Sequence, residues 1–113
     1  MTLPHPDRLV VEREKIADYL LNPEHPYGAS KARFFMAFGF RHEHWERLAA
    51  ALREHGRRHE VAEVRETGFG PRYVVDGELR TPDGRRPQVR SVWQLDAGAI
   101  APRLITAYPA EEK

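Results

Sequence analysis

Two side chains that could handle a phosphate stand close together in residues 20–40, LLNPEHPYGASKARFFMAFGF. His25 lies between two prolines, which restrict the loop that carries it. Lys31 follows in the first turn of an expected helix, where the helix dipole is already positive. A lysine is slightly unfavourable there, so Lys31 indicates a bound anion, although a solvated lysine is the simpler alternative. An imidazole can act as a base or an acid, and an ammonium can bind a phosphate.

Three further polar side chains come from the C-terminal part of the chain. Arg90 lies in QVRSVWQL, and Thr106 and Tyr108 lie in PRLITAYP. Because side chains alternate between the faces of a strand, Arg90 should lie opposite the apolar face that holds Trp93. The facing of the last strand is ambiguous. If Thr106 and Tyr108 share the face of Arg90, an arginine, a hydroxyl and a phenol lie together.

Such a trio suits cleavage of RNA without a metal. That reaction needs a base for the 2′-hydroxyl, an acid for the leaving oxygen and a cation near the phosphate. Histidine, tyrosine, arginine and lysine can supply these functions. The same trio is also typical of a solvated sheet surface, and this alternative stays open.

Helices are expected in the first half of the chain, at residues 12–21, 30–39 and 42–56. The first should stop at Asn22-Pro23, Ser30 should cap the second, and Gly56 should end the third. The side chains expected in the core are Phe34, Phe35 and Phe38 from the second helix and Trp45, Leu48, Ala49 and Leu52 from the third. Burying one phenylalanine ring contributes about 2–3 kcal/mol, so the core fully explains those rings.

After residue 60 the apolar period changes from a helical to an alternating one. The four expected strands are VAEVRET, RYVVDGEL, QVRSVWQL and PRLITAYP. Their short connections predict an antiparallel meander, and the order of elements predicts an α+β fold with N-terminal helices packed on the four-stranded sheet. We expect a single domain over residues 1–113 with its core at about 12–109, and a frayed tail at residues 110–113.

Composition narrows the chemistry. The chain has 113 residues, 41% hydrophobic and 31% charged, which favours one folded domain over disorder. The absence of cysteine excludes thiolate catalysis, disulfides and thiolate metal sites. Neither a signal peptide nor a membrane-spanning segment is recognisable, so we expect a cytoplasmic protein.

Histidine spacing does not predict a metal centre. His55 and His59 are four residues apart, as metal ligands on a helix can be. However, Gly56 should end the helix between them, and no carboxylate stands in the usual zinc-protease arrangement. We therefore expect neither a metal nor another cofactor.

The order of these segments resembles a known bacterial family, DUF6883. The resemblance rests on LLNPEHPYGASKARFFMAFGF, the helix around WERLAAALREH, and FGPRYVVDGELRTPDGRRPQVRSVWQLD with the final PRLITAYP. It covers roughly residues 12–109. The same order is similar to that of nuclease domains from contact-dependent inhibition and polymorphic toxins, which resemble the barnase, colicin and RelE-type ribonucleases.

That resemblance implies a metal-independent ribonuclease, often one that cleaves tRNA. It matches His25 and Lys31 in the opening motif, Arg90 in the third strand, and Thr106 and Tyr108 in the last strand. We take these five as candidate catalytic residues. The stretch from Arg72 to Arg103 is mildly basic, and we take these two arginines as candidate RNA-binding residues.

Because the chain begins just before the matching region, we expect the free-standing toxin of a toxin–antitoxin pair. Its expected partners are RNA and a cognate antitoxin, itself expected to be small and acidic. One alternative is a non-catalytic RNA-binding or partner-binding module. Another is an antitoxin or immunity protein, which the arginine-rich sheet disfavours because a protein that masks a nucleic-acid site is more often acidic.

Overall fold

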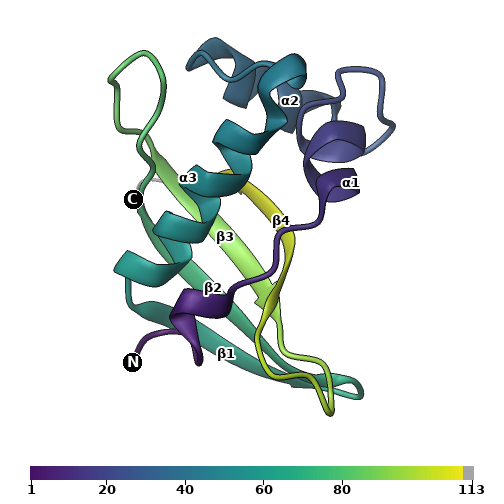
Figure 1. Ribbon diagram of the computed structural model, residues 1–113, viewed down its shortest axis with the longest axis vertical. Helices are drawn as coiled ribbons and strands as arrows, with labels where there is room; N and C mark the ends of the chain where they lie inside the picture. The colour runs from purple at the N-terminus through teal and green to yellow at the C-terminus, as the bar shows by residue number, and fades with distance from the viewer. Residues whose placement is uncertain (111–113) are drawn as a thin grey trace.

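Helices fill the first half of the chain and strands the second, in a computed structural model that describes residues 1–110 (Figure 1). The elements are η1 (Pro6–Arg8), α1 (Arg13–Lys15), η2 (Ile16–Leu20), α2 (Ala29–Ala37), η3 (His42–His44), α3 (Trp45–Arg58), β1 (Val61–Thr67), β2 (Gly70–Glu78), β3 (Gln88–Gln94) and β4 (Arg103–Pro109). The frayed tail predicted at residues 110–113 falls almost entirely outside the described residues. Within residues 1–110, no helix is long and apolar enough to cross a membrane.

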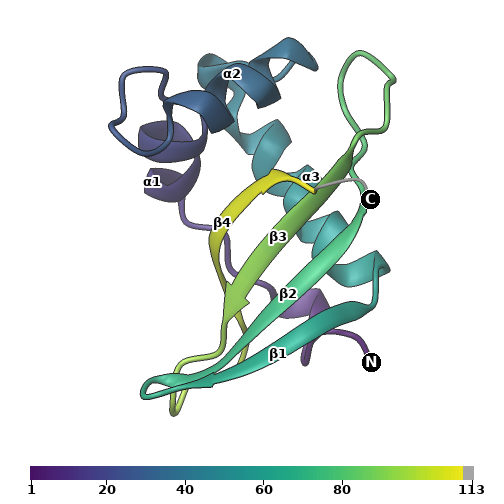
Figure 2. The same ribbon diagram turned by 180° about the vertical axis from the view of Figure 1, so that it is seen from behind.

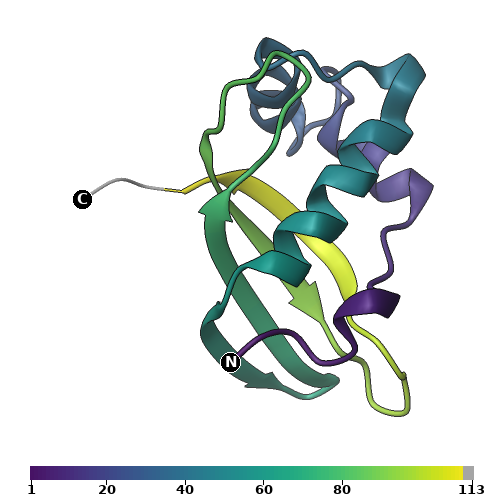
Figure 3. The same ribbon diagram turned by 60° about the vertical axis from the view of Figure 1, so that its left-hand side comes forward.

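The four strands form one antiparallel sheet in the order β1-β2-β3-β4, as the meander prediction requires. The helices of residues 1–110 all lie on one face, the inner face, and Figure 2 shows the opposite, outer face uncovered by them. Figure 3 shows α3 running across the inner face, while α1 and α2 pack beside the β4 edge. The α+β prediction is therefore confirmed.

The first two helices differ in detail from the prediction. Residues 12–21 form α1 followed by one wide π turn, η2, in which the N–H of Leu21 reaches the carbonyl of Ile16 at 2.8 Å. The prediction that Ser30 caps α2 is wrong, because the N-cap is Gly28 and Ser30 lies inside the helix. A Cβ at Gly28 would stand 2.4 Å from the carbonyl oxygen of Tyr19, so glycine lets the two segments pack closely.

The third helix does not end at Gly56, as predicted, but continues to Arg58. Gly56 is buried because the helix backbone lies directly against the core at this point. A Cβ there would stand 2.8 Å from Trp93 and about 3 Å from Leu9 and Leu3. The glycine is thus a packing residue inside the helix rather than its end signal.

Gly56→Ala should therefore destabilise the protein, although alanine is the better helix former by about 1 kcal/mol. Overpacking a rigid core typically costs about 1–3 kcal/mol, and Trp93 has no exposed side to move toward. Urea unfolding of the purified variant measures the loss. Gly68→Ala is the control, because a Cβ at Gly68 meets nothing within 4 Å. Equal stability of Gly56→Ala and the wild type would contradict this packing role.

The aromatic stripe of α2 only partly enters the core. Phe35 is fully buried and packs edge to face near Phe40, while Phe34 is partly buried. Phe38, predicted as core, is the half-buried C-cap residue of α2, and the guanidinium of Arg85 covers its ring at 4.4 Å from the centroid. Of the four core positions predicted in the third helix, Leu48, Ala49 and Leu52 are buried and Trp45 is partly buried.

Alternation along β3 follows the prediction, with Val89, Ser91 and Trp93 buried on the inner face and Arg90 on the outer face. In β4 the alternation breaks. Trp93 pairs with Leu104 but Val92 pairs with Thr106, so one extra residue forms a β-bulge. The bulge places Thr106 and Tyr108 on the outer face with Arg90.

Candidate functional site

Four of the five candidate catalytic residues gather at the β4 edge of the sheet, in one group with the side chain of Tyr19 from η2. We call Tyr19 and four of these residues the β4-edge cluster; the four are His25, Lys31, Thr106 and Tyr108. Arg90 adjoins the cluster on the outer face, since its strand pairs it directly with Tyr108. The 25–31 segment reaches this edge because α2 packs beside β4.

His25 is held by its own backbone. Its Nδ1 accepts hydrogen bonds from the N–H groups of Tyr27 and Gly28, each at 3.0 Å, which satisfies orphan donors at the start of α2. The neutral ring therefore carries its proton on Nε2. The ring also packs edge to face on Tyr19, with centroids 4.9 Å apart.

Lys31 sits between two aromatic rings. Its Nζ lies 5.6 Å from the ring centroid of Tyr19 and 6.0 Å from that of Tyr108, and it donates to the carbonyl of Tyr27 at 3.3 Å. Within residues 1–110 no salt bridge joins it to a carboxylate. The ammonium is thus positioned by neutral groups, and its charge remains for an anion.

The hydroxyl groups of the cluster join the helical part to the sheet. Tyr19 and Thr106 share a hydrogen bond of 2.9 Å. On the outer face Arg90 donates from Nε and Nη2 to the two carboxylate oxygens of Asp76, at 2.7 and 2.8 Å. This pair raises the pKa of Arg90, with a smaller contribution from Tyr108, and hydrogen bonding to Arg90 lowers the pKa of Asp76. The guanidinium is therefore fixed in direction beside Tyr108 and permanently charged.

The two predicted RNA-binding arginines lie on the same outer face but not in the cluster. Arg72 and Arg103 flank Gln94, which lies four residues along β3 from Arg90, the partner of Tyr108. Arg72 donates to Gln94 at 3.1 Å, and Arg103 donates to Asp96 at 2.7 Å, which raises the pKa of Arg103. They line the same surface as Arg90 without contacting the cluster.

Two hollows flank the cluster. One has a volume of about 550 Å³ and is lined by Glu14, Lys15, Asp18, Tyr19, His25, Tyr27, Ile105 and Thr106. The other, of about 340 Å³, is lined by Ser30, Lys31, Tyr108 and Pro109. Tyr19 lines the first hollow and Lys31 lines the second, so the contact between these two side chains links the two hollows. A chain of linked groups, such as a nucleic-acid strand, is the kind of ligand that can occupy two adjacent hollows.

Sequence reasoning missed Tyr19 and Asp76. Tyr19 fits the apolar spacing of the first helix, and nothing in that spacing shows that its hydroxyl reaches Thr106. Asp76 could have been found, because a two-stranded register places an acid directly opposite Arg90 once the TPDGRR turn is taken as a hairpin loop.

A buried polar network under α3 was also missed. Nε2 of His55 lies 2.9 Å from the carbonyl of Val89 and 3.1 Å from that of Gly77. Because carbonyls only accept, Nε2 donates and Nδ1 accepts from the Ser91 hydroxyl at 2.9 Å. Trp93 in turn donates to Ser91 at 2.8 Å. Burial lowers the pKa of His55 to about 4.

His55 therefore has a structural role, because both of its ring nitrogens are already hydrogen-bonded to β2 and β3. Within residues 1–110 no group of three or more His, Asp or Glu side chains is placed to hold a metal ion.

The model of one family, described as Domain of unknown function (DUF6883), matches residues 2–111, which is nearly the whole chain. No curated protein matches the chain, and no solved structure matches it.

Proposed function

The chain belongs to the DUF6883 family, and we propose that it is a metal-independent ribonuclease acting at the β4-edge cluster. One observation supports this most: two cations, two hydroxyl groups and an imidazole from four separate segments converge on one edge of the sheet. Lys31 contributes a positive charge that has no carboxylate partner within residues 1–110. Arg90 contributes a positive charge whose direction is fixed by Asp76. Such a set can bind a phosphodiester and move protons beside it.

In the proposed reaction the 2′-hydroxyl loses its proton and its oxygen attacks the adjacent phosphorus. The bond from phosphorus to the 5′-oxygen breaks, and that oxygen takes a proton. Because Nδ1 of His25 already accepts two backbone hydrogen bonds, the neutral ring carries its proton on Nε2 and donates a hydrogen bond to a phosphate oxygen without giving that proton up. Tyr108, beside Arg90, gives its phenolic proton to the leaving 5′-oxygen, and the 2′-hydroxyl proton passes to solvent, which returns a proton to Tyr108. Lys31 and Arg90 stabilise the extra charge on the phosphate, and Thr106 holds Tyr19 in place.

The biological setting that fits this activity is a toxin–antitoxin pair, with tRNA among the substrates and a small acidic protein as the inhibitor. An acidic partner would complement the arginines on the outer face of the sheet. Expression without such a partner should stop growth.

A non-catalytic RNA-binding or partner-binding module is the second candidate. It is favoured by the backbone hydrogen bonds to His25 and by the ion pairs of Arg90 and Arg103. These groups already have partners within the protein, as the side chains of an ordinary protein surface do. A binding module needs the same cations but no free proton donor or acceptor.

An RNA digest separates the two. Purified protein incubated with total RNA or tRNA in excess EDTA should cut the RNA and spare DNA of the same sequence, because DNA lacks the attacking 2′-hydroxyl. The 5′ fragment of each cut should carry a 2′,3′-cyclic phosphate at its 3′ end, detectable by mass spectrometry. Intact RNA together with saturable RNA binding would establish the binding module instead.

A further inference from the structure

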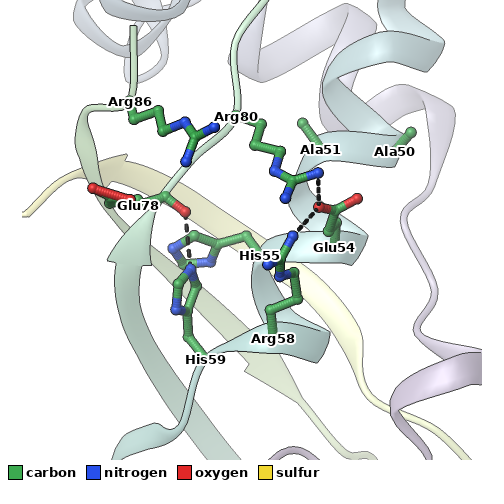
Figure 4. A pocket seen from close by; sticks show the side chains of 9 residues that line it. All are labelled: Ala50, Ala51, Glu54, His55, Arg58, His59, Glu78, Arg80 and Arg86. Carbon is green, nitrogen blue, oxygen red and sulfur yellow. Dashed lines mark hydrogen bonds and ion pairs between the residues drawn. The ribbon is translucent and has the colours of Figure 1, made fainter. Parts of the chain in front are cut away.

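A third hollow lies between the C-terminal half of α3 and the loop that joins β2 to β3, and no residue of the β4-edge cluster lines it (Figure 4). Its volume is about 180 Å³. The lining residues are Ala50, Ala51, Glu54, His55, Arg58, His59, Glu78, Arg80 and Arg86. We call it the arginine recess, because three of its side chains are arginines that come from two different parts of the chain.

Two of these arginines share one oxygen atom. Nη1 of Arg58 lies 3.0 Å from Oε1 of Glu54, and Nη1 of Arg80 lies 3.2 Å from the same oxygen. The hydrogen bond from Arg58 is the main reason that the pKa of Glu54 is lowered. A single carboxylate oxygen thus occupies the place where two guanidinium groups converge, which is the place that an oxygen of a bound oxyanion would take.

The third arginine has no such partner. Figure 4 shows Arg86 pointing into the recess from the opposite limb of the loop, and within residues 1–110 it makes no salt bridge. The Glu78 side chain extends away from Arg58 and Arg80 in the same view, and only its backbone carbonyl faces the recess, where it accepts from His59 at 2.9 Å. Three guanidinium groups therefore face one carboxylate.

The loop that presents Arg80 and Arg86 is fixed before any ligand arrives. Arg85, between them, donates to the carbonyl of Ala37 at 2.8 Å and to Asp83 at 2.7 Å. The N–H of Asp83 also reaches the carbonyl of Phe38 at the end of α2. A loop held on a helix end loses little freedom on binding, so its arginines are preorganised.

We propose that the arginine recess binds a phosphate group, as the free ion or as a small phosphate monoester. Guanidinium forks match the oxygens of a phosphate, and three of them outweigh the single carboxylate. The recess is smaller than the roughly 300–1,000 Å³ typical of pockets that enclose drug-sized ligands, so it suits the phosphate and not an attached nucleoside. This site is separate from the proposed ribonuclease site and does not depend on that activity.

Calorimetric titration of the whole protein with inorganic phosphate, and separately with adenosine 5′-monophosphate, tests the proposal at constant ionic strength. Saturable binding is expected, and Arg80→Gln and Arg86→Gln should each weaken it about 10-fold or more, since hydrogen bonds to charged groups are the strong ones. Arg57→Gln is the matched control, because Arg57 is an exposed arginine of α3 that does not line the recess. Tighter binding of the nucleotide than of the ion would identify a monoester as the ligand; the reverse order would identify the free ion.

Glu54→Gln should act in the opposite direction. It keeps the shape of the side chain but removes the charge that competes with the ligand, so phosphate affinity should rise, by about 10-fold. If Glu54, Arg58 and Arg80 only form a surface ion-pair network, the same change alters stability slightly and creates no affinity. Absence of saturable binding in both the wild type and Glu54→Gln would overturn the proposal, and so would equal weakening by Arg57→Gln and Arg86→Gln.

Discussion

Arg90→Ala is expected to lower RNA cleavage by about 100-fold or more while the protein stays folded, because loss of one preorganised transition-state donor typically costs that much. Arg90 is held by both carboxylate oxygens of Asp76 and lies opposite Tyr108 in the sheet. Its guanidinium therefore needs no reorganisation when charge develops on a phosphate at this edge. Initial rates of cleavage of a defined tRNA, measured in excess EDTA, give the effect directly.

Arg65→Ala is the matched control for this prediction. Arg65 is also an outer-face arginine paired with a carboxylate, that of Glu63 at 2.9 Å, but it belongs to β1 at the far edge of the sheet. It should change cleavage less than a few-fold, which would show that position and not net charge is what matters. Circular dichroism of both variants confirms folding.

A purely structural role for Arg90 makes a different prediction. In that case Asp76→Asn, which breaks the same ion pair from the other side, should lower stability as much as Arg90→Ala, and neither should affect cleavage by folded protein. Equal cleavage by folded Arg90→Ala and wild-type protein would remove Arg90 from the site.

The fold class followed from the sequence because it depends on long patterned segments. The change from a helical to an alternating apolar period near residue 60 separates helices from strands, and four short alternating segments with tight connections allow little besides a meander. The inner facing of Trp93 followed in the same way, since burial of so large a ring dominates the facing of its strand.

The candidate site depends on the β-bulge in β4, which the apolar pattern of the sequence does not reveal. With strict alternation, burial of Leu104 would carry Thr106 and Tyr108 inward as well. The bulge at Ile105 reverses their facing, so that Leu104 and Ala107 are both buried while the two hydroxyl residues reach the outer face. A bulge adds one residue to a strand, and no distinctive residue type marks it in the sequence. The sequence therefore left the facing of Thr106 and Tyr108 ambiguous.

The helix end predicted at Gly56 was wrong for a related reason. Gly56 has the sequence context of a helix end, but its neighbours in space are Trp93 and Leu9, which come from distant parts of the chain. His25 could be placed near a helix start from its spacing, but its two backbone hydrogen bonds depend on the loop conformation. The Gly56 case is a tertiary contact that overrides a local signal, and the His25 case is a local contact that spacing alone does not specify.

Acidification should destabilise the protein through His55. Its pKa is lowered to about 4, first by burial and then by the nearby His59, against an ordinary value of 6.5 in the unfolded chain. Hydrogen bonds to the carbonyls of Gly77 and Val89 and the charge of Asp76 oppose the shift without cancelling it. Below pH 6.5 the unfolded chain takes up a proton that the native network excludes, so stability is full above that pH and falls as the pH approaches 4.

The expected loss in the free energy of unfolding between pH 7.5 and pH 5 is about 2 kcal/mol, as linkage gives for one histidine with this shift. Urea unfolding at the two pH values measures it, and pH 5 lies above the range in which most carboxylates titrate. His55→Gln removes the titrating ring and should lose about 2 kcal/mol less over the same interval, although it should also be weaker at pH 7.5 because the Ser91 and Val89 partners are disturbed. His42→Gln, at an exposed position of η3, should keep the full wild-type loss.

A wild-type protein equally stable at both pH values would mean that the space around His55 under α3 admits a protonated imidazole. The chain from Trp93 through Ser91 to His55 would then rearrange on protonation instead of resisting it, because the hydroxyl of Ser91 would have to turn from donor to acceptor.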